Sequence, residues 1–448
     1  MSEAAAPIGS IADCVAYFES GETPREDYAI GTEHEKIGVL ADSGDRVPYE
    51  GERGVGVLLE RIAERDGWKR VYEDGHVIAL GKEGASITLE PGGQIELSGA
   101  PLKTIRETCR EFNAHVDLVK EVSEDLDIVW LALAVDPLHD ASQVPVMPKH
   151  RYEIMRSYLP QKGGLALDMM HASATVQANF DFSNERDMAL KMRTAMGITP
   201  IVSAIFANSS IAAGTESGFV SKRVAIWCDT DPDRCGILHQ VFEPGFGYRD
   251  YADWALDVPM FFIIRDDRYI PAHGTSFRTF MEDGFEGHHA IVGDWDMHLT
   301  TLFPEVRLKR IIEVRGADAV PRDLICALPA LWKGILYDDD ALDAAWQLVS
   351  GYSRAEREAA QLAVAREGLG ASIAQLPVLE LAREIVEISA KGLARIAAVT
   401  GIHPDEQIFL DPIRALIERG QSPGEVILDK WRGDWQGSMD RLIEYARY

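Results

Sequence analysis

Glu33 and Glu35 are the first residues whose spacing indicates chemistry, and they lie in the segment GTEHEK at residues 31–36. Alternate residues of a β-strand point to the same face, so both carboxylates would project together with His34 behind them. Two carboxylates among apolar neighbours are costly unless a cation neutralises them. Mg²⁺ prefers oxygen ligands and keeps water and substrate phosphates in its shell. The pair therefore predicts a Mg²⁺ site for a phosphate-bearing substrate, with an exposed edge strand and solvated acids as the alternative.

Two further segments place polar residues at strand spacing. In EPGGQIELSG at residues 90–99, Glu90 precedes a Gly-Gly pair, and an amide and then Glu96 follow on one face. The glycines would let the backbone approach a ligand closely. In ATVQANFDF at residues 174–182, Gln177 alternates with apolar residues. Either segment could line a site; the alternatives are a Pro-Gly turn leading into a half-exposed strand for residues 90–99 and a solvated strand face for residues 174–182.

Basic residues are concentrated in the segment PEVRLKRIIEVRGAD at residues 304–318. If the segment is extended throughout, Arg307, Lys309, Glu313 and Arg315 share one face. Arginine is well suited to bidentate recognition of phosphate or carboxylate. The pattern predicts an acid that holds a metal beside cations that bind phosphate, and a simple salt-bridge ladder is the alternative.

The elements that must position these residues follow from the hydrophobic pattern, which recurs at helical spacing or alternates as in strands. Helices are predicted at 10–20, 54–66, 102–126 and 185–207, and strands within 70–98 and at 28–41, 128–135, 174–182 and 305–315. Helical patterns continue from about residue 321. Strands mixed with long helices favour an α+β fold with an antiparallel sheet. We expect residues 1–448 to form one catalytic domain with a largely helical C-terminal part.

Composition excludes several classes of function. The 448 residues include 45 Lys and Arg against 72 Asp and Glu, a formal net charge of −27, so nucleic acid and anionic membrane are not expected partners. There is no run of 18 apolar residues and no signal or transit pattern at the N-terminus, so we expect a cytosolic protein. No GxxxxGK[ST], GxGxxG or GxSxG segment supports a P-loop, Rossmann or serine-hydrolase mechanism.

Several long segments, taken together, resemble the glutamate–cysteine ligase family in its plant and proteobacterial form. The resemblance runs from about residue 10 to the C-terminus and rests on GTEHEKIG (31–38), GASITLEPGGQIELSGAPL (84–102), MPKHRYEIM (147–155), TVQANFDF (175–182), FANSS (206–210), YADWALDVPMFF (251–262) and HLTTLFPEVRLKRIIEVRGAD (298–318). It implies a glutamine-synthetase-like fold, in which an antiparallel sheet forms a cradle with helices outside. It also implies that ATP activates the γ-carboxylate of L-glutamate as an acyl phosphate, which the amine of L-cysteine then attacks.

The resemblance also implies roles for individual residues. Two or three Mg²⁺ ions would be held by Glu33, Glu35, Glu90, Glu96, Glu313 and Gln177, the last of which stands where related enzymes often have a histidine. Arg315 and Arg307 would stabilise the transferring phosphoryl group, since charge neutralisation is the main need in such a transfer. Arg151 in MPKHRY and Arg223 in SKRVAIW match arginines expected to bind the glutamate carboxylate.

Cys109 and Cys326 match a cysteine pair that bridges helices in the family, and the hypothesis that follows is a regulatory disulfide. Two buried free thiols are the alternative, because Cys109 lies on an apolar helix face. The sequence departs from the plant pattern in the Ala-Ser-Ala at residues 172–174, where plant members have Arg-Thr-Cys, and at Phe261, where they have tyrosine. Either change would alter the amino-acid pocket.

Three other functions remain open at this point. A ligase of the same family with another acceptor amine is the nearest, followed by an ATP-dependent kinase on the same fold and a binding protein without activity. ADP release that depends on cysteine distinguishes these alternatives. An acidic chain of this kind would act on small molecules as a monomer or a homodimer.

Overall fold

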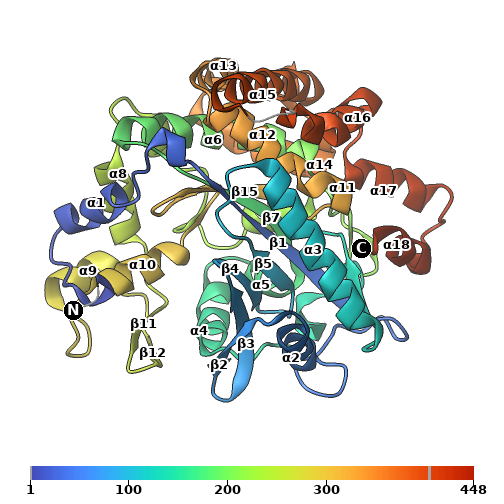
Figure 1. The fold of residues 1–448 in the computed structure, drawn as a ribbon, viewed down its shortest axis with the longest axis horizontal. Helices are drawn as coiled ribbons and strands as arrows, with labels where there is room; N and C mark the ends of the chain where they lie inside the picture. The colour runs from blue at the N-terminus through green and yellow to red at the C-terminus, as the bar shows by residue number, and fades with distance from the viewer. Residues whose placement is uncertain (1–2, 402–404) are drawn as a thin grey trace.

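The central feature of the computed structural model, which describes residues 3–401 and 405–448, is one large antiparallel β-sheet (Figure 1). Its strands follow in the order β14 (Val306–Leu308), β15 (Ile312–Asp318), β7 (Thr175–Phe180), β1 (Ile30–Leu40), β5 (Ile95–Ser98), β4 (Ala85–Leu89), β3 (His76–Lys82) and β2 (Lys69–Glu73). The short strand β6 (Ile128–Leu131) pairs with the second half of β1. The prediction of an α+β fold built on an antiparallel sheet is confirmed.

Helices cover one face of this sheet, the rear face; the opposite face is the front face. Helix α3 (Ile105–Glu124) lies across this rear face in Figure 1. Helix α12 (Ala327–Leu336) packs against β7, and α6 (Glu185–Ile205) packs against β15. Strand β1 follows the alternation expected from its sequence, because His34 is buried against Phe112 of α3 with ring centroids 4.2 Å apart. Glu33 and Glu35 therefore point to the opposite, front face.

The other helices surround the sheet and form most of the chain after residue 321. On the front side lie α4 (His150–Tyr158), α5 (Ala166–Ala172) and α7 (Lys222–Trp227). The remaining helices are α1 (Ile11–Glu19), α2 (Val55–Asp66), α8 (Tyr248–Asp257), α9 (Phe277–Asp283), α10 (Val292–Thr300), α11 (Arg322–Ile325), α13 (Asp339–Val349), α14 (Arg354–Glu367), α15 (Val378–Thr400), α16 (Asp411–Arg419), α17 (Pro423–Arg432) and α18 (Met439–Ala446). In the parts of the chain that the structure describes, none of the helices is long and apolar enough to cross a membrane.

The predicted single strand at 305–315 is wrong, because the chain reverses there. Strands β14 and β15 form a hairpin in which the Lys309 N–H donates to the Ile311 carbonyl at 2.9 Å. Each arm alternates with its polar residues at odd-numbered positions, and only the neighbouring pairs Lys309-Arg310 and Ile311-Ile312 interrupt the pattern at the turn. The reversal places Arg307 directly opposite Glu313 on the neighbouring strand. The strand predicted at 128–135 is also shorter, since β6 ends at Leu131.

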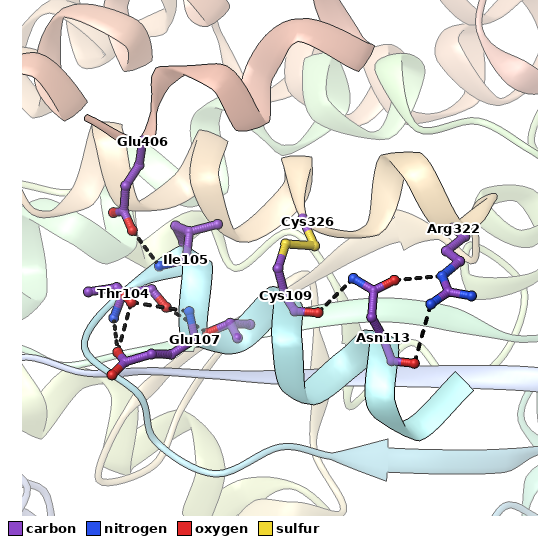
Figure 2. The surroundings of a disulfide bond; sticks show 9 residues. Thr104, Ile105, Glu107, Cys109, Asn113, Arg322, Cys326 and Glu406 are labelled. Carbon is purple, nitrogen blue, oxygen red and sulfur yellow. Dashed lines mark hydrogen bonds between the residues drawn. A yellow bond between two sulfur atoms is a disulfide. The ribbon is translucent and has the colours of Figure 1, made fainter. Parts of the chain in front are cut away.

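Cys109 and Cys326, the pair named by the family resemblance, form a disulfide in the structure (Figure 2). Their Cα atoms are 5.7 Å apart, within the usual range for such bonds. Next to the bond, Arg322 donates from Nε to Asn113 Oδ1 at 2.5 Å, and Asn113 donates to the Cys109 carbonyl at 2.7 Å. The disulfide and these hydrogen bonds join α3 to the start of the helical C-terminal part. Its regulatory role stays a prediction.

Cys326→Ser should lower the free energy of unfolding by about 2–5 kcal/mol, because the bond closes a long loop and constrains the unfolded chain. Urea denaturation without reductant measures the change, and Cys228→Ser, which alters an exposed free thiol, is the matched control. Equal stabilities of Cys326→Ser and the wild type would show that the link contributes nothing to the fold.

Candidate active site

A cavity of about 350 Å³ opens on the front face of the sheet and collects the predicted site residues. Nine of the ten predicted metal, phosphate and carboxylate ligands line it, and Glu313 alone lies below the surface. The nine come from separate parts of the chain: Glu33, Glu35, Glu90, Glu96, Arg151, Gln177, Arg223, Arg307 and Arg315.

Strand register brings the acids together. Glu33 on β1 pairs with Gln177 on β7 and Ser98 on β5, and Glu35 pairs with Glu96 on β5. Directly opposite residues in an antiparallel sheet share a face, with Cβ atoms about 4.5–5.5 Å apart. Three carboxylates therefore stand on two adjacent strands, and the backbone alone determines their spacing.

The acids accept hydrogen bonds but have no ion pair among the residues that the structure describes. The donors are Asn179 Nδ2 to Glu33 at 2.8 Å, the Thr175 backbone N–H to Glu35 at 3.0 Å, and the hydroxyls of Thr88 and Ser98 to Glu96 at 3.0 and 2.9 Å. Burial, together with the neighbouring acids Glu313 and Glu96, raises the pKa of Glu33 to about 7. Burial and Glu90 raise the pKa of Glu96 to about 7, and burial and the same neighbour raise that of Glu35 well above its ordinary range.

Glu90 reaches the cavity from the turn that joins β4 to β5. Gly93 has a φ of +79° and Gly92 has no room for a Cβ, which would lie 2.3 Å from the His171 carbonyl. The buried Arg46 donates to the Gly92 carbonyl at 2.5 Å and pairs with Asp136 at 3.0 Å. These contacts explain the Gly-Gly pair, because only glycine fits a turn held this closely.

Glu313 is the counter-ion of three cations. Its carboxylate binds Arg307 at 2.7 Å, Lys309 at 3.0 Å and also Arg315. Burial alone would raise the pKa of Glu313, but Arg307, Lys309 and Arg315 hold it well below its ordinary range. The sequence left a metal ligand and a salt-bridge ladder as alternatives for Glu313, and the geometry is that of the ladder. Gln177 joins this cluster by accepting from Arg315 Nη1 at 2.7 Å.

Arg151 and Arg223 are free of ion pairs within the described ranges. Arg223 is only 2% exposed and donates from Nη2 to the Arg315 carbonyl at 3.1 Å, and its Nε has no hydrogen-bond partner. Arg151 lies 5.9 Å from the ring of Phe262, and its Nε also has no partner. Two cations that face a cavity without carboxylate partners suit an anionic ligand.

Several cavity residues were missed by the sequence analysis. Lys149 lies in the MPKHRY segment, and burial lowers its pKa to about 8, but only the arginine of that segment was singled out. Trp227 and Phe303 form apolar walls, together with Met155, Met169 and Met170. Apolar residues at helical spacing give no signal of a site, because the same pattern describes any helix packed on a core.

The acids fit a divalent cation. Four carboxylates without counter-ions, three of them with raised pKa values, need positive charge when ionised. In the described part of the chain, no three His, Cys, Asp or Glu side chains stand close enough to enclose a metal ion by themselves. Mg²⁺ needs no such cage, because it binds through one or two carboxylates and completes its shell with water and phosphate.

The fold is that of a glutamate–cysteine ligase. A crystal structure of the enzyme from Francisella tularensis in complex with AMP superimposes with a TM-score of 0.58 and 12% identity, covering 94% of this chain and 87% of that one. The sequence matches the glutamate-cysteine ligase family 2 (GCS2) over residues 29–445, and the chain belongs to this family. The prediction of a ligase enzyme from this family is therefore confirmed.

Curated plant relatives match over nearly the whole chain. Glutamate–cysteine ligase B of Oryza sativa subsp. japonica is 44% identical over 439 residues, which are 97% of this chain and 87% of the relative. The Arabidopsis thaliana enzyme is 42% identical, with 97% and 82% covered. Both are named chloroplastic, as are the tobacco and tomato enzymes. The names of these relatives contradict the expected cytosolic location. That expectation was wrong, because it relied on the pattern of a few N-terminal residues.

The raised pKa of Glu33 makes the stability of the metal-free protein depend on pH. Its pKa is about 7 in the folded chain against an ordinary 4.5, so the folded state holds a proton that the unfolded state has lost. This contribution is complete below about pH 4.5 and is lost as the pH rises through about 7, at up to about 1.4 kcal/mol per pH unit.

Glu33→Gln should therefore flatten the fall in unfolding free energy between about pH 4.5 and 7. Urea denaturation in EDTA at a series of pH values measures it. Glu418→Gln, at an exposed helix position, is the control and should keep the wild-type slope. A wild-type slope in Glu33→Gln would show that this carboxyl titrates normally.

Proposed function

We propose that this chain joins the γ-carboxylate of L-glutamate to the amine of L-cysteine, using ATP and Mg²⁺. The products would be γ-glutamylcysteine, ADP and phosphate, the first step of glutathione biosynthesis. Family membership and the plant relatives support the pair of amino acids. The AMP in the Francisella tularensis enzyme supports an adenine nucleotide as the co-substrate. The catalytic unit would be the single domain formed by the sheet and its helices.

The observation that favours phosphoryl transfer most is the division of charge within one cavity. Acids without counter-ions stand on β1, β5 and the 90–94 turn, and cations stand on β14, β15, α4 and α7. A nucleotide with a carboxylate co-substrate brings several negative charges. A chain with a net charge of −27 can bind them only where it has gathered cations and leaves room for metal.

Each group then has a distinct role. Arg315, held by Gln177 and Glu313, would contact the transferring phosphoryl group from the β15 side of the cavity. Arg307 already donates to Glu313 and to the carbonyls of Thr300 and Leu302. It would therefore act mainly by holding Glu313 and Arg315 in place. The unpaired Arg151 and Arg223 would bind the carboxylate of glutamate. No side-chain nucleophile is needed, because the substrate carboxylate attacks ATP.

The divalent ions would be held by Glu33, Glu35, Glu90 and Glu96, with Gln177 at the edge of the set. Bound Mg²⁺ would neutralise phosphate charge as the phosphoryl group moves. Glu313 would join the metal ligands only if it exchanged its three cations for the metal. We therefore propose the four cavity acids as the main ligands.

Glu35→Gln should lower kcat at least about 100-fold, because one carboxylate ligand of the metal is lost. Stability should stay the same or rise, since a buried acid with a raised pKa is removed. A coupled assay of ADP release measures the rate, thermal unfolding measures the stability, and Glu418→Gln is the control. A folded Glu35→Gln enzyme with full activity would exclude Glu35 from the site.

The same assay tests the reaction itself. ADP release in the presence of glutamate should require cysteine, with γ-glutamylcysteine detected by mass spectrometry in equal amount. Release that ignores cysteine would point to a kinase. Release that needs a different amine would point to another ligase of the family.

A further inference from the structure

Lys149 places a half-buried ammonium group in the active-site cavity, with no carboxylate of the described chain within ion-pair distance. Its Nζ donates to the Leu89 carbonyl at 2.8 Å and lies 3.5 Å from the Tyr152 hydroxyl. No ion pair of Lys149 occurs among residues 3–401 and 405–448. An ammonium group has three donors. At least one of them therefore has no protein acceptor and is available to a ligand.

Three other lysines of the interior have a carboxylate partner, whereas the buried Lys36, whose Nζ has no hydrogen-bond partner among the described residues, does not line the cavity. Lys191 pairs with Asp187 at 2.9 Å, Lys333 pairs with Glu406, and Lys309 pairs with Glu313 at 3.0 Å. A charge removed from water is costly unless an opposite charge compensates it. Lys149 differs from these three, because it lines the cavity and has only a carbonyl and a phenol as hydrogen-bond partners. A bound anion would supply the missing compensation.

Lys149, at the start of α4, contacts the sheet at a strand remote from the cluster around Arg315. It contacts Leu89 at the end of β4, and β5, β1 and β7 lie between β4 and β15 in the sheet. The phosphoryl group is assigned to the β15 side, and the glutamate carboxylate to Arg151 and Arg223. With the phosphates assigned to Mg²⁺ and Arg315, and the unreactive carboxylate of glutamate assigned to Arg151 and Arg223, the carboxylate of the acceptor amino acid still needs a cation.

We propose that Lys149 binds the carboxylate of the acceptor amino acid and so selects amino acids over simple amines; this inference rests on the proposed function. Methionines from the adjoining helices line the same cavity, Met155 on α4 and Met169 and Met170 on α5. Their soft, polarisable side chains suit a thiol group. The acceptor subsite therefore lies between α4, α5 and β4.

Cysteamine tests this assignment, because it has the amine and the thiol of cysteine but no carboxylate. The wild-type enzyme should prefer cysteine over cysteamine in kcat/KM by at least about 30-fold, as expected for a desolvated ion pair. In Lys149→Met that ratio should fall by a similar factor, while the KM values for ATP and glutamate change little. Lys149→Arg should keep an intermediate ratio, because it retains the positive charge.

Lys120→Met is the matched control, since it removes the same charge from an exposed position on α3 and should leave the ratio unchanged. If Lys149→Met does not fold, the cysteine-to-cysteamine ratios of kcat/KM in the wild type and in Lys149→Arg still test the proposal. Equal use of cysteine and cysteamine by the wild type would overturn the proposal. So would an unchanged ratio in Lys149→Met, or a selective rise in the KM for ATP. If the wild type makes no γ-glutamyl product at all, the proposed function fails as well.

Discussion

The antiparallel pairing of β1 with β5 and β7 is the constraint on which the rest of the structure depends. It places Glu33 opposite Ser98 and Gln177, and Glu35 opposite Glu96, so the acid wall is set by backbone hydrogen bonds. A shift of one residue would turn these acids toward the helices and bring His34 to the front. The same register that buries His34 against Phe112 therefore builds the active site, and packing and catalysis cannot be changed separately.

Charge in the site is arranged so that acids and cations do not simply cancel. Glu313 holds Arg307, Lys309 and Arg315 in one cluster, whereas the acids on β1 and β5 have only hydrogen bonds. Burial and mutual repulsion raise the pKa of Glu33 and Glu35, so these acids need a cation when they are ionised. The cavity is thus prepared for cations on one side and anions on the other, although the chain as a whole is strongly acidic.

Local periodicity allowed much of this to be predicted. The alternation in β1 and β7, and the apolar stripe of α3, each reflect one face packed on a core, so their positions followed from spacing alone. The turn at Lys309–Ile311 did not, because it has no glycine or proline and the polar residues of both arms fall at odd-numbered positions, as in one continuous strand. The burial of Glu313 and the position of Lys149 beside Leu89 depend on contacts between distant segments, which no local pattern contains.

The order of strands in the sheet differs from their order along the chain, and this has a consequence for assembly. Strand β15 pairs with β7, yet helices α6 to α10 separate the two in sequence. On the ribosome the acids of β1 and β5 emerge first, and the arginines of β14 and β15 follow only after most of the chain. Pairing of distant strands is slow because the loop between them must close before any contact forms. We therefore expect β14 and β15 to complete both the sheet and the charge balance of the site. A nascent chain that ends before them would be an incomplete and highly acidic intermediate.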